Sequence, residues 1–231
     1  MNLPIFYPMK DTIFARDYID EICSKYQHAV FDLDGTLIDS MPVWHDSARN
    51  FLRTQGIEAD ANLNQVVFNL SLIQGAEYIQ KTYLPDFSIQ QIIDGVESVV
   101  EDGYKNYIPL KDGVFEFLSE LKKRGVPCVI ATSTDVHLAR FALERLKIAD
   151  FFTGIYTCSQ LQTSKDKPDI YLTAANSIGG KAEDSIVFED ILMATKTATN
   201  AGFAVAAIYD EFSKDDWGEI QRFATYAFAG Y

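Results

Sequence analysis

The chain has 231 residues, of which 48% are hydrophobic, enough for a substantial core in one domain or in a domain with a smaller insert. Its 33 acidic residues outnumber the 20 basic ones and give a formal net charge of −13. A surface of this charge repels nucleic acid and anionic membranes, so we expect neither as a partner. An anionic ligand would need local cations or a metal at its site.

The first predicted elements are a lead-in helix, a buried strand and a helical insert. Residues 1–27 contain the helical pattern TIFARDYIDEICSKY, whose apolar residues we expect to pack on the core. The run AVFDL (29–33) is nearly continuously hydrophobic, which is typical of a parallel strand covered on both faces. Residues 41–107 then show helical patterns and no convincing strand, which predicts a helical insert.

After the insert, strand and helix patterns alternate along the chain. The predicted strands are VPCVIAT (126–132), GIYTC (154–158), SIVFED (185–190) and FAVAAIYD (203–210). The predicted helices cover 114–125, 135–152, 167–180 and 191–202. This alternation predicts an α/β fold with a doubly wound, Rossmann-like parallel sheet. We expect the α/β core domain to comprise residues 1–40 and 108–231, and a small α-helical domain to comprise 41–107.

Cysteine use and hydropathy indicate a reduced, cytoplasmic protein. Cys23, Cys128 and Cys158 are scattered without a CxxC motif or a Cys/His cluster, so we expect buried thiols rather than zinc ligands or disulfides. No apolar run is long enough to span a membrane. The N-terminal stretch also lacks the basic and apolar regions of a signal peptide.

Acidic residues follow the first predicted strand. Asp32 and Asp34 lie at its carboxyl end, and Gly35 permits a tight turn there. Ligands of open α/β sheets bind beyond the carboxyl ends of the strands. Two carboxylates in one small cleft suit a divalent cation with oxygen ligands.

Other strand ends supply matching groups. Thr132, Ser133 and Thr134 offer hydroxyl and amide donors to an anion, next to a helix N-terminus. Lys165 precedes another helix, and the adjacent carboxylates Glu189 and Asp190 end the strand at 185–190. Acids at two strand ends, with hydroxyl and lysine groups at others, predict a site for Mg²⁺ and phosphate.

Together these stretches resemble the haloacid dehalogenase superfamily. FDLDGTLIDS (31–40) resembles its motif I, while Thr132, Lys165 and the pair Glu189-Asp190 fall where motifs II, III and IV are expected. The four motifs occur in the right order over about residues 28–210, which is a far more specific signal than one DxD. Lys167 is a rival for Lys165, but the register of the following PDIY favours Lys165.

The resemblance implies a role for each core residue. Asp32 would be the nucleophile that forms an aspartyl-phosphate. Asp34 would be the general acid for the leaving oxygen and then the general base for the attacking water. Thr132 and Ser133 would bind the phosphoryl oxygens, and Lys165 would neutralise charge on the phosphoryl group and on Asp32.

The resemblance also implies Mg²⁺ as the cofactor. Its ligands would be Asp32, the backbone carbonyl of Asp34 and Asp190, with Glu189 binding directly or through water. Motif IV departs from the common E-D-S-x-x-G, because this chain reads EDILMA. The acids are kept, so we expect the metal site to remain and the hydrogen bonding around it to change.

The insert resembles the helical cap of the β-phosphoglucomutase and phosphoglycolate phosphatase branch. Such caps close over the site, exclude water and contact the leaving group. His45 is a candidate substrate contact, with helix packing an equal alternative, since the cap histidine of the β-phosphoglucomutases falls one residue earlier, at Trp44. For Gln74 and Lys81 we expect a solvated helix face, with contacts between cap and core as the alternative.

Three functions remain open at this point. The first is a Mg²⁺-dependent phosphatase for a small phosphorylated metabolite such as a sugar phosphate. The second is a sugar-phosphate mutase of the β-phosphoglucomutase type, and the third is a catalytically silent relative that binds metabolites or partners. Asp34 favours phosphoryl transfer over dehalogenation, because a leaving halide needs no proton. A cap that opens and closes is compatible with a monomer.

Overall fold

The computed structural model of the chain describes residues 13–68 and 70–231. Its contacts divide it into two compact units, which we call the sheet unit and the helical unit. The sheet unit comprises the described residues up to Ile38, with Leu110–Val136 and Lys147–Tyr231. The helical unit comprises Asp39–Pro109 and His137–Leu146.

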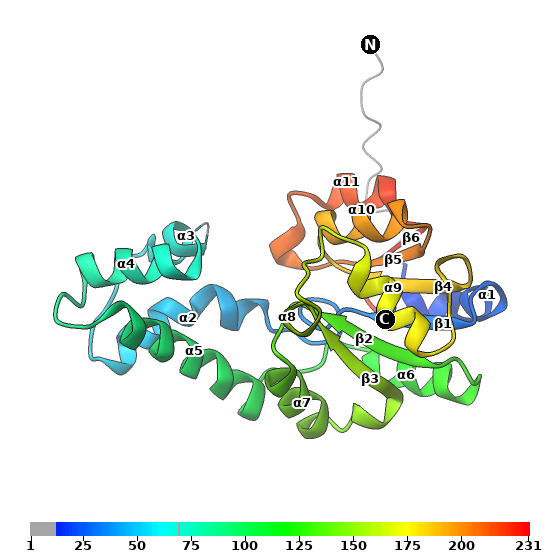
Figure 1. Ribbon diagram of the computed structural model, residues 1–231, viewed down its shortest axis with the longest axis horizontal. Coiled ribbons are helices and arrows are strands. Elements are labelled where there is room, and N and C mark those ends of the chain that lie inside the picture. Colours follow the sequence, from blue (N-terminus) through cyan, green and yellow to red (C-terminus); the bar gives the residue numbers. More distant parts are fainter. Residues whose placement is uncertain (1–12, 69) are drawn as a thin grey trace, which may run out of the picture. The chain divides into compact units, whose positions relative to one another are not determined.

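The sheet unit is built on six parallel strands in the order β3-β2-β1-β4-β5-β6 (Figure 1). They are β1 (His28–Phe31), β2 (Cys128–Thr132), β3 (Phe152–Thr157), β4 (Ser185–Glu189), β5 (Ala204–Ile208) and β6 (Tyr226–Phe228). The order runs outward from β1 to β3 and then resumes at β4 on the other side of β1. The predicted doubly wound α/β fold is therefore confirmed, and its topological switch point lies between β1 and β4.

Helices cover both faces of this sheet (Figure 1). They are α1 (Ile19–Lys25), α6 (Val114–Lys123), α8 (Cys158–Leu161), α9 (Asp169–Ser177), α10 (Leu192–Asn200) and α11 (Trp217–Phe223), with short 3-10 turns η1 (Ala15–Tyr18), η2 (Ala149–Phe151), η3 (Ala182–Asp184) and η4 (Glu211–Ser213). Val30 and Val187 pack with α9 and α10 on one face. On the other face Phe31 stacks on Phe188, with ring centroids 4.3 Å apart, and Phe117 of α6 meets Phe188 edge-on. Successive strand residues alternate between two buried faces, which explains the continuous hydrophobic runs.

Three elements, α7 (Val136–Arg145), β3 and β6, differ from the predictions. The helix predicted over 135–152 ends earlier, because α7 stops before Lys147, whose φ of 57° is left-handed. The chain then enters β3 at Phe152, two residues before the predicted strand. Strand β6 was not predicted, since its three residues form no long apolar run. Residues 1–12 lie outside the described residues, and the rest of the predicted lead-in helix forms η1 and α1.

The helical unit contains α2 (Met41–Thr54), α3 (Leu63–Phe68), α4 (Leu72–Thr82) and α5 (Ile89–Asn106). Its core is formed by apolar residues from all four helices, among them Phe51, Leu52, Leu63, Ile79, Ile92 and Val96. Helix α5 passes close to α2 at Gly95, where a Cβ would lie 2.1 Å from the ring of Phe51. Both α4 and α5 begin with a capping box, Ser71 with Gln74 and Ser88 with Gln91.

Most of α7 groups with the helical unit by contacts, although the predicted core domain includes residues 137–146. The Nε of Arg145 donates a hydrogen bond of 3.0 Å to the carbonyl of Tyr104, and its guanidinium also contacts the carbonyl of Ile108. The ammonium of Lys105 lies 4.7 Å from the ring centroid of Phe141. These contacts attach α7 to the end of α5. The role of the helical unit as a cap stays a prediction.

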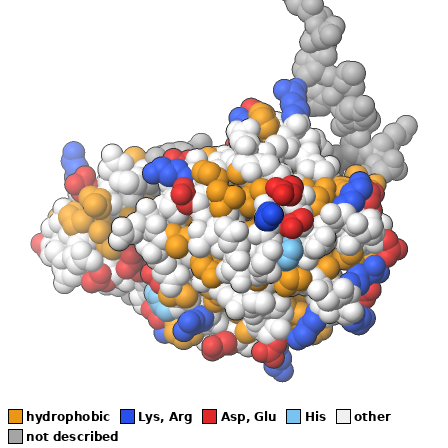
Figure 2. Space-filling view, turned by 45° about the vertical axis from the view of Figure 1, so that its right-hand side comes forward, with side chains coloured by type: hydrophobic (Ala, Val, Ile, Leu, Met, Phe, Trp, Pro, Cys, Tyr) orange, Lys and Arg blue, Asp and Glu red, His pale blue; other side chains and the backbone are white. Residues whose placement is uncertain are grey.

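Acidic and basic side chains are interspersed among apolar ones on the face shown in Figure 2. Ion pairs near the surface of the sheet unit include Arg124 with Asp20 at 2.7 Å and Lys196 with Glu219 at 2.6 Å. Such exposed pairs contribute little to stability. The three cysteines are free thiols. Among the described residues, the helices are too short or too polar to span a membrane.

Candidate active site

The site begins where β1 and β4 end, side by side at the switch point. The register pairs Phe31 with Phe188, and the backbone N–H of Asp32 donates to the carbonyl of Phe188 at 3.0 Å. The residues that follow, Asp32 and Glu189, therefore lie next to each other. Both are buried, with 4% and 0% of their surface exposed. The parallel pairing thus brings together two acids that lie far apart in the sequence.

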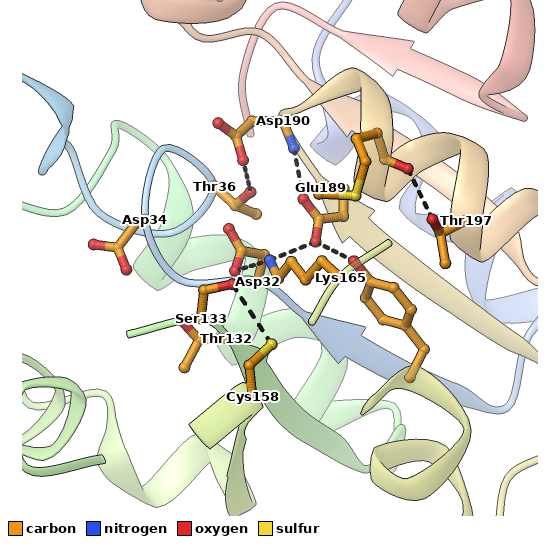
Figure 3. Close-up of polar contacts among 12 residues, drawn as sticks. Asp32, Asp34, Thr36, Thr132, Ser133, Cys158, Lys165, Glu189, Asp190 and Thr197 are labelled. Carbon is orange, nitrogen blue, oxygen red and sulfur yellow. Dashed lines mark hydrogen bonds and ion pairs between the residues drawn. The ribbon is translucent and has the colours of Figure 1, made fainter. Parts of the chain in front are cut away.

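Lys165 joins these two acids, as Figure 3 shows. Its buried ammonium contacts Oδ1 of Asp32 and donates to Oε1 of Glu189 at 2.6 Å. The hydroxyl of Tyr171, on α9, donates to the same Oε1 at 2.7 Å. Lys167, the rival lysine, is exposed. The structure therefore places Lys165, and not Lys167, beside Asp32 and Glu189.

Asp190 lies on the other side of Glu189 and is held by the loop after β1. The hydroxyl of Thr36 donates to its Oδ1 at 3.1 Å (Figure 3). Gly35 has a φ of +80°, and a Cβ at that position would lie 2.3 Å from Oδ2 of Asp190. Only glycine both adopts this backbone conformation readily and leaves room for the carboxylate. The glycine of the DxDGT motif therefore serves the site as well as the turn.

The acidic cluster of Asp32, Glu189 and Asp190 fits a divalent cation. Each residue offers a carboxylate oxygen, and these oxygens lie within 4.8 Å of one another. Oxygen ligands of this kind are those that Mg²⁺ prefers. Three buried carboxylates face the single ammonium of Lys165, which leaves negative charge to be balanced. The cluster could therefore bind a metal ion, which supports this part of the predicted metal site.

Burial and mutual repulsion perturb the protonation of this cluster. Burial raises the pKa of Asp32 to about 7; Lys165 opposes this rise and Glu189 adds to it. Burial also raises the pKa of Asp190 well above its ordinary value, and the nearby charges of Asp32 and Glu189 add to this rise. Burial acts to lower the pKa of Lys165, but the two neighbouring carboxylates outweigh it and the pKa is raised. Lys165 therefore stays charged while Asp32 and Asp190 resist ionisation, a conflict that a bound cation relieves.

Asp34 has a different environment from the acidic cluster. It is half-buried, and the hydroxyl of Thr134 donates to its Oδ2 at 2.6 Å. Thr132 is buried at the end of β2, where its hydroxyl accepts a bond of 3.1 Å from the N–H of Thr134. Ser133 is exposed, with its Oγ 3.6 Å from Sγ of Cys158. The predicted phosphate-binding residues thus line one turn, beside the predicted acid-base residue.

His45 belongs to α2 of the helical unit. Its Nδ1 lies 2.9 Å from Oδ1 of Asp46. The neighbouring Trp44 donates from its indole nitrogen to the hydroxyl of Tyr104 at 2.9 Å. A substrate contact by His45 stays a prediction. Gln74 and Lys81 are exposed, and Gln74 closes the capping box of α4.

Sequence reasoning missed two buried tyrosines near the acids. Tyr171 lies six residues after Lys165 in the apolar register of α9, so its pattern indicated packing only. Tyr231 is 1% exposed, and its hydroxyl has no hydrogen-bond partner among the described residues. Burial raises the pKa of this hydroxyl well above the usual value, and the charges of Asp32, Asp190 and Glu189 add to the rise. No motif includes Tyr231, so nothing in the sequence associated it with the site.

Comparison with known families shows which family the chain belongs to. The profile of the haloacid dehalogenase-like hydrolase family matches residues 29–208. The chain belongs to this family. The match confirms the relationship predicted from the four motifs, and it spans every residue of the acidic cluster.

Named relatives in this family include phosphatases. A phosphorylated carbohydrates phosphatase of Thermotoga maritima is 24% identical over 173 residues, covering 75% of this chain and 80% of that protein. Hexitol phosphatase A of Escherichia coli is 27% identical over 182 residues, covering 78% and 81%. Among solved structures, a T. maritima protein provisionally described as a β-phosphoglucomutase has a TM-score of 0.78 at 21% identity, covering 87% of this chain and 93% of its own. At this identity the last match shows a shared fold only.

Proposed function

We propose that this haloacid dehalogenase-like hydrolase is a Mg²⁺-dependent phosphatase of a small phosphorylated metabolite, a sugar or polyol phosphate. The observation that carries the proposal is the buried contact of Lys165 with both Asp32 and Glu189, beside Asp190. A cluster of this kind suits an anionic phosphoryl group only with a cation present. The two named phosphatase relatives support the substrate class.

The first half-reaction transfers the phosphoryl group to Asp32. Lys165 holds Oδ1 of Asp32, so we assign Oδ2 as the oxygen that attacks phosphorus. The bond between phosphorus and the substrate's ester oxygen breaks as the new bond forms. Asp34, held by Thr134, gives its proton to the leaving alkoxide, and an alcohol departs.

The second half-reaction releases inorganic phosphate. Asp34 takes a proton from a water molecule, whose oxygen attacks phosphorus. The bond between phosphorus and Asp32 breaks, and the Asp32 carboxylate is restored. Mg²⁺ would balance the negative charge of this cluster. Its ligands would be the carboxylates of Asp32 and Asp190 and the backbone carbonyl of Asp34, and Glu189 would bind it directly or through water. Thr132 and Ser133 would bind phosphoryl oxygens.

A phosphate-release screen tests the proposal. The substrates are sugar phosphates, hexitol phosphates, phosphoglycolate and nucleotides, each with and without Mg²⁺. We expect release from sugar or hexitol phosphates with Mg²⁺, and a loss of about a thousandfold or more in Asp32→Asn. Asp39→Asn is the matched control, because Asp39 is an exposed acid of the same stretch, and it should keep full activity.

Two results would contradict the proposal. Conversion of glucose 1-phosphate to glucose 6-phosphate without release of phosphate would show a mutase. Absence of hydrolysis over the whole panel, in protein that binds Mg²⁺, would favour a silent relative.

A further inference from the structure

The hydroxyl of Tyr171 makes an unusual contact for a buried tyrosine. The residue lies in α9 and is completely buried, with its ring 6.4 Å from the ring of Phe203. Its hydroxyl donates to Oε1 of Glu189 at 2.7 Å. A buried hydroxyl needs a partner, and here the partner is a carboxylate of the acidic cluster.

Glu189 is held on both of its oxygens. Oε1 accepts from Lys165 at 2.6 Å and from Tyr171 at 2.7 Å, while Oε2 accepts a longer bond of 3.3 Å from the N–H of Asp190. Two short bonds from different elements fix Oε1 in place. Oε2, with its single long bond, is the oxygen that remains able to bind a cation or its water.

A purely structural explanation would be that the hydroxyl simply uses whatever acceptor is close. The buried hydroxyl of Tyr231 argues against this, since the same unit keeps it without a partner among the described residues. Burial of a tyrosine hydroxyl therefore does not by itself produce a bond to the cluster. The bond of Tyr171 to Oε1, shared with Lys165, favours a role in orienting Glu189.

We propose that Tyr171 is a positioning residue, whose hydroxyl works with Lys165 to fix Oε1 of Glu189 and so directs Oε2 toward the cation. Any effect of Tyr171 on turnover rests on the proposed function. The effect of Tyr171 on Mg²⁺ affinity does not depend on that function. Partners that orient metal ligands contribute about 10-fold to 100-fold in metal affinity or activity.

The test compares Tyr171→Phe with Tyr226→Phe by calorimetric titration of the full chain with Mg²⁺. Phenylalanine keeps the ring, and thermal unfolding checks that each variant is folded. Tyr226 is the matched control, because its hydroxyl donates to the carboxylate of Glu21 at 3.0 Å, outside the cluster. We expect Mg²⁺ binding about tenfold weaker in Tyr171→Phe and unchanged in Tyr226→Phe.

A double-mutant cycle with Glu189→Gln tests whether Tyr171 acts through Glu189. The two changes should be non-additive in Mg²⁺ affinity, because Tyr171→Phe already removes the hydrogen bond whose acceptor Glu189→Gln changes. Affinity equal to wild type in Tyr171→Phe, additive effects in the cycle, or no Mg²⁺ binding by the wild type would overturn the positioning role. Weaker Mg²⁺ binding in a protein that hydrolyses no phosphate ester would uphold it and overturn the proposed function instead.

Discussion

At the scale of single residues, the acidic cluster is costly to fold without a cation. Asp190 illustrates this, because burial and the charges of Asp32 and Glu189 raise its pKa. A carboxyl group with a raised folded-state pKa contributes its full stability below its ordinary pKa, where it is protonated in both states. That contribution is lost as the pH rises through the folded-state pKa, because the native state must then hold a disfavoured charge.

Asp190→Asn should therefore stabilise the protein when a chelator is present. Asparagine is neutral at every pH and can still accept the bond from Thr36. We expect the free energy of unfolding at pH 8 to rise by about 1 kcal/mol or more, with a smaller gain at pH 5. Urea denaturation at the two pH values measures the difference. Equal destabilisation at both would contradict this explanation.

The sequence predicted the members of the site better than their contacts. Asp32, Glu189 and Asp190 lie at the carboxyl ends of predicted strands, and Lys165 lies just before a predicted helix. Parallel strands bring such ends together. The contact of Tyr171 with Glu189 depends on how α9 packs over the sheet, which no local pattern encodes.

At the scale of elements, local patterns predicted the buried strands well because both sheet faces are covered. Continuous apolar runs matched β1, β2, β4 and β5 within a few residues. The predictions failed where one residue changed the backbone, as at Lys147, or where an element was too short to show a period, as in β6. Periodicity alone cannot show a left-handed residue between a helix and a strand.

The N-cap residue of helix α5, Ser88, offers a test of how helix capping stabilises the helical unit. Ser88 accepts from the N–H of Gln91 at 3.2 Å, and the side chain of Gln91 accepts from the N–H of Ser88 at 2.8 Å. Ser88→Ala should lower the free energy of unfolding by about 1 kcal/mol. Ser119→Ala, inside α6, is the control and should cost less, because alanine is favoured in helix interiors.

Denaturant unfolding measures this difference. Mg²⁺ affinity should stay the same in Ser88→Ala, since Ser88 lies in the helical unit and the acidic cluster in the sheet unit. No change in stability, or a change in Mg²⁺ affinity, would contradict this assignment.

At the scale of the whole molecule, the chain combines a sheet unit that carries the acidic cluster with a helical unit inserted after its first strand. The family match covers residues 29–208, which include all four motifs of the sheet unit and also the helical unit. The substrate was not predictable from those motifs. In the proposed mechanism they act on the phosphoryl group, which every phosphate ester shares, whereas other residues would recognise the leaving group.

The most direct test of the account is to trap the covalent intermediate. Protein turning over a hexitol or sugar phosphate with Mg²⁺ is quenched with borohydride, which reduces an acyl phosphate to an alcohol, and its peptides are analysed by mass spectrometry. The account predicts that Asp32 is converted to homoserine, and that the conversion is absent in Asp32→Asn and without substrate. Phosphate release with an unmodified Asp32, or reduction of a different carboxylate, would contradict it.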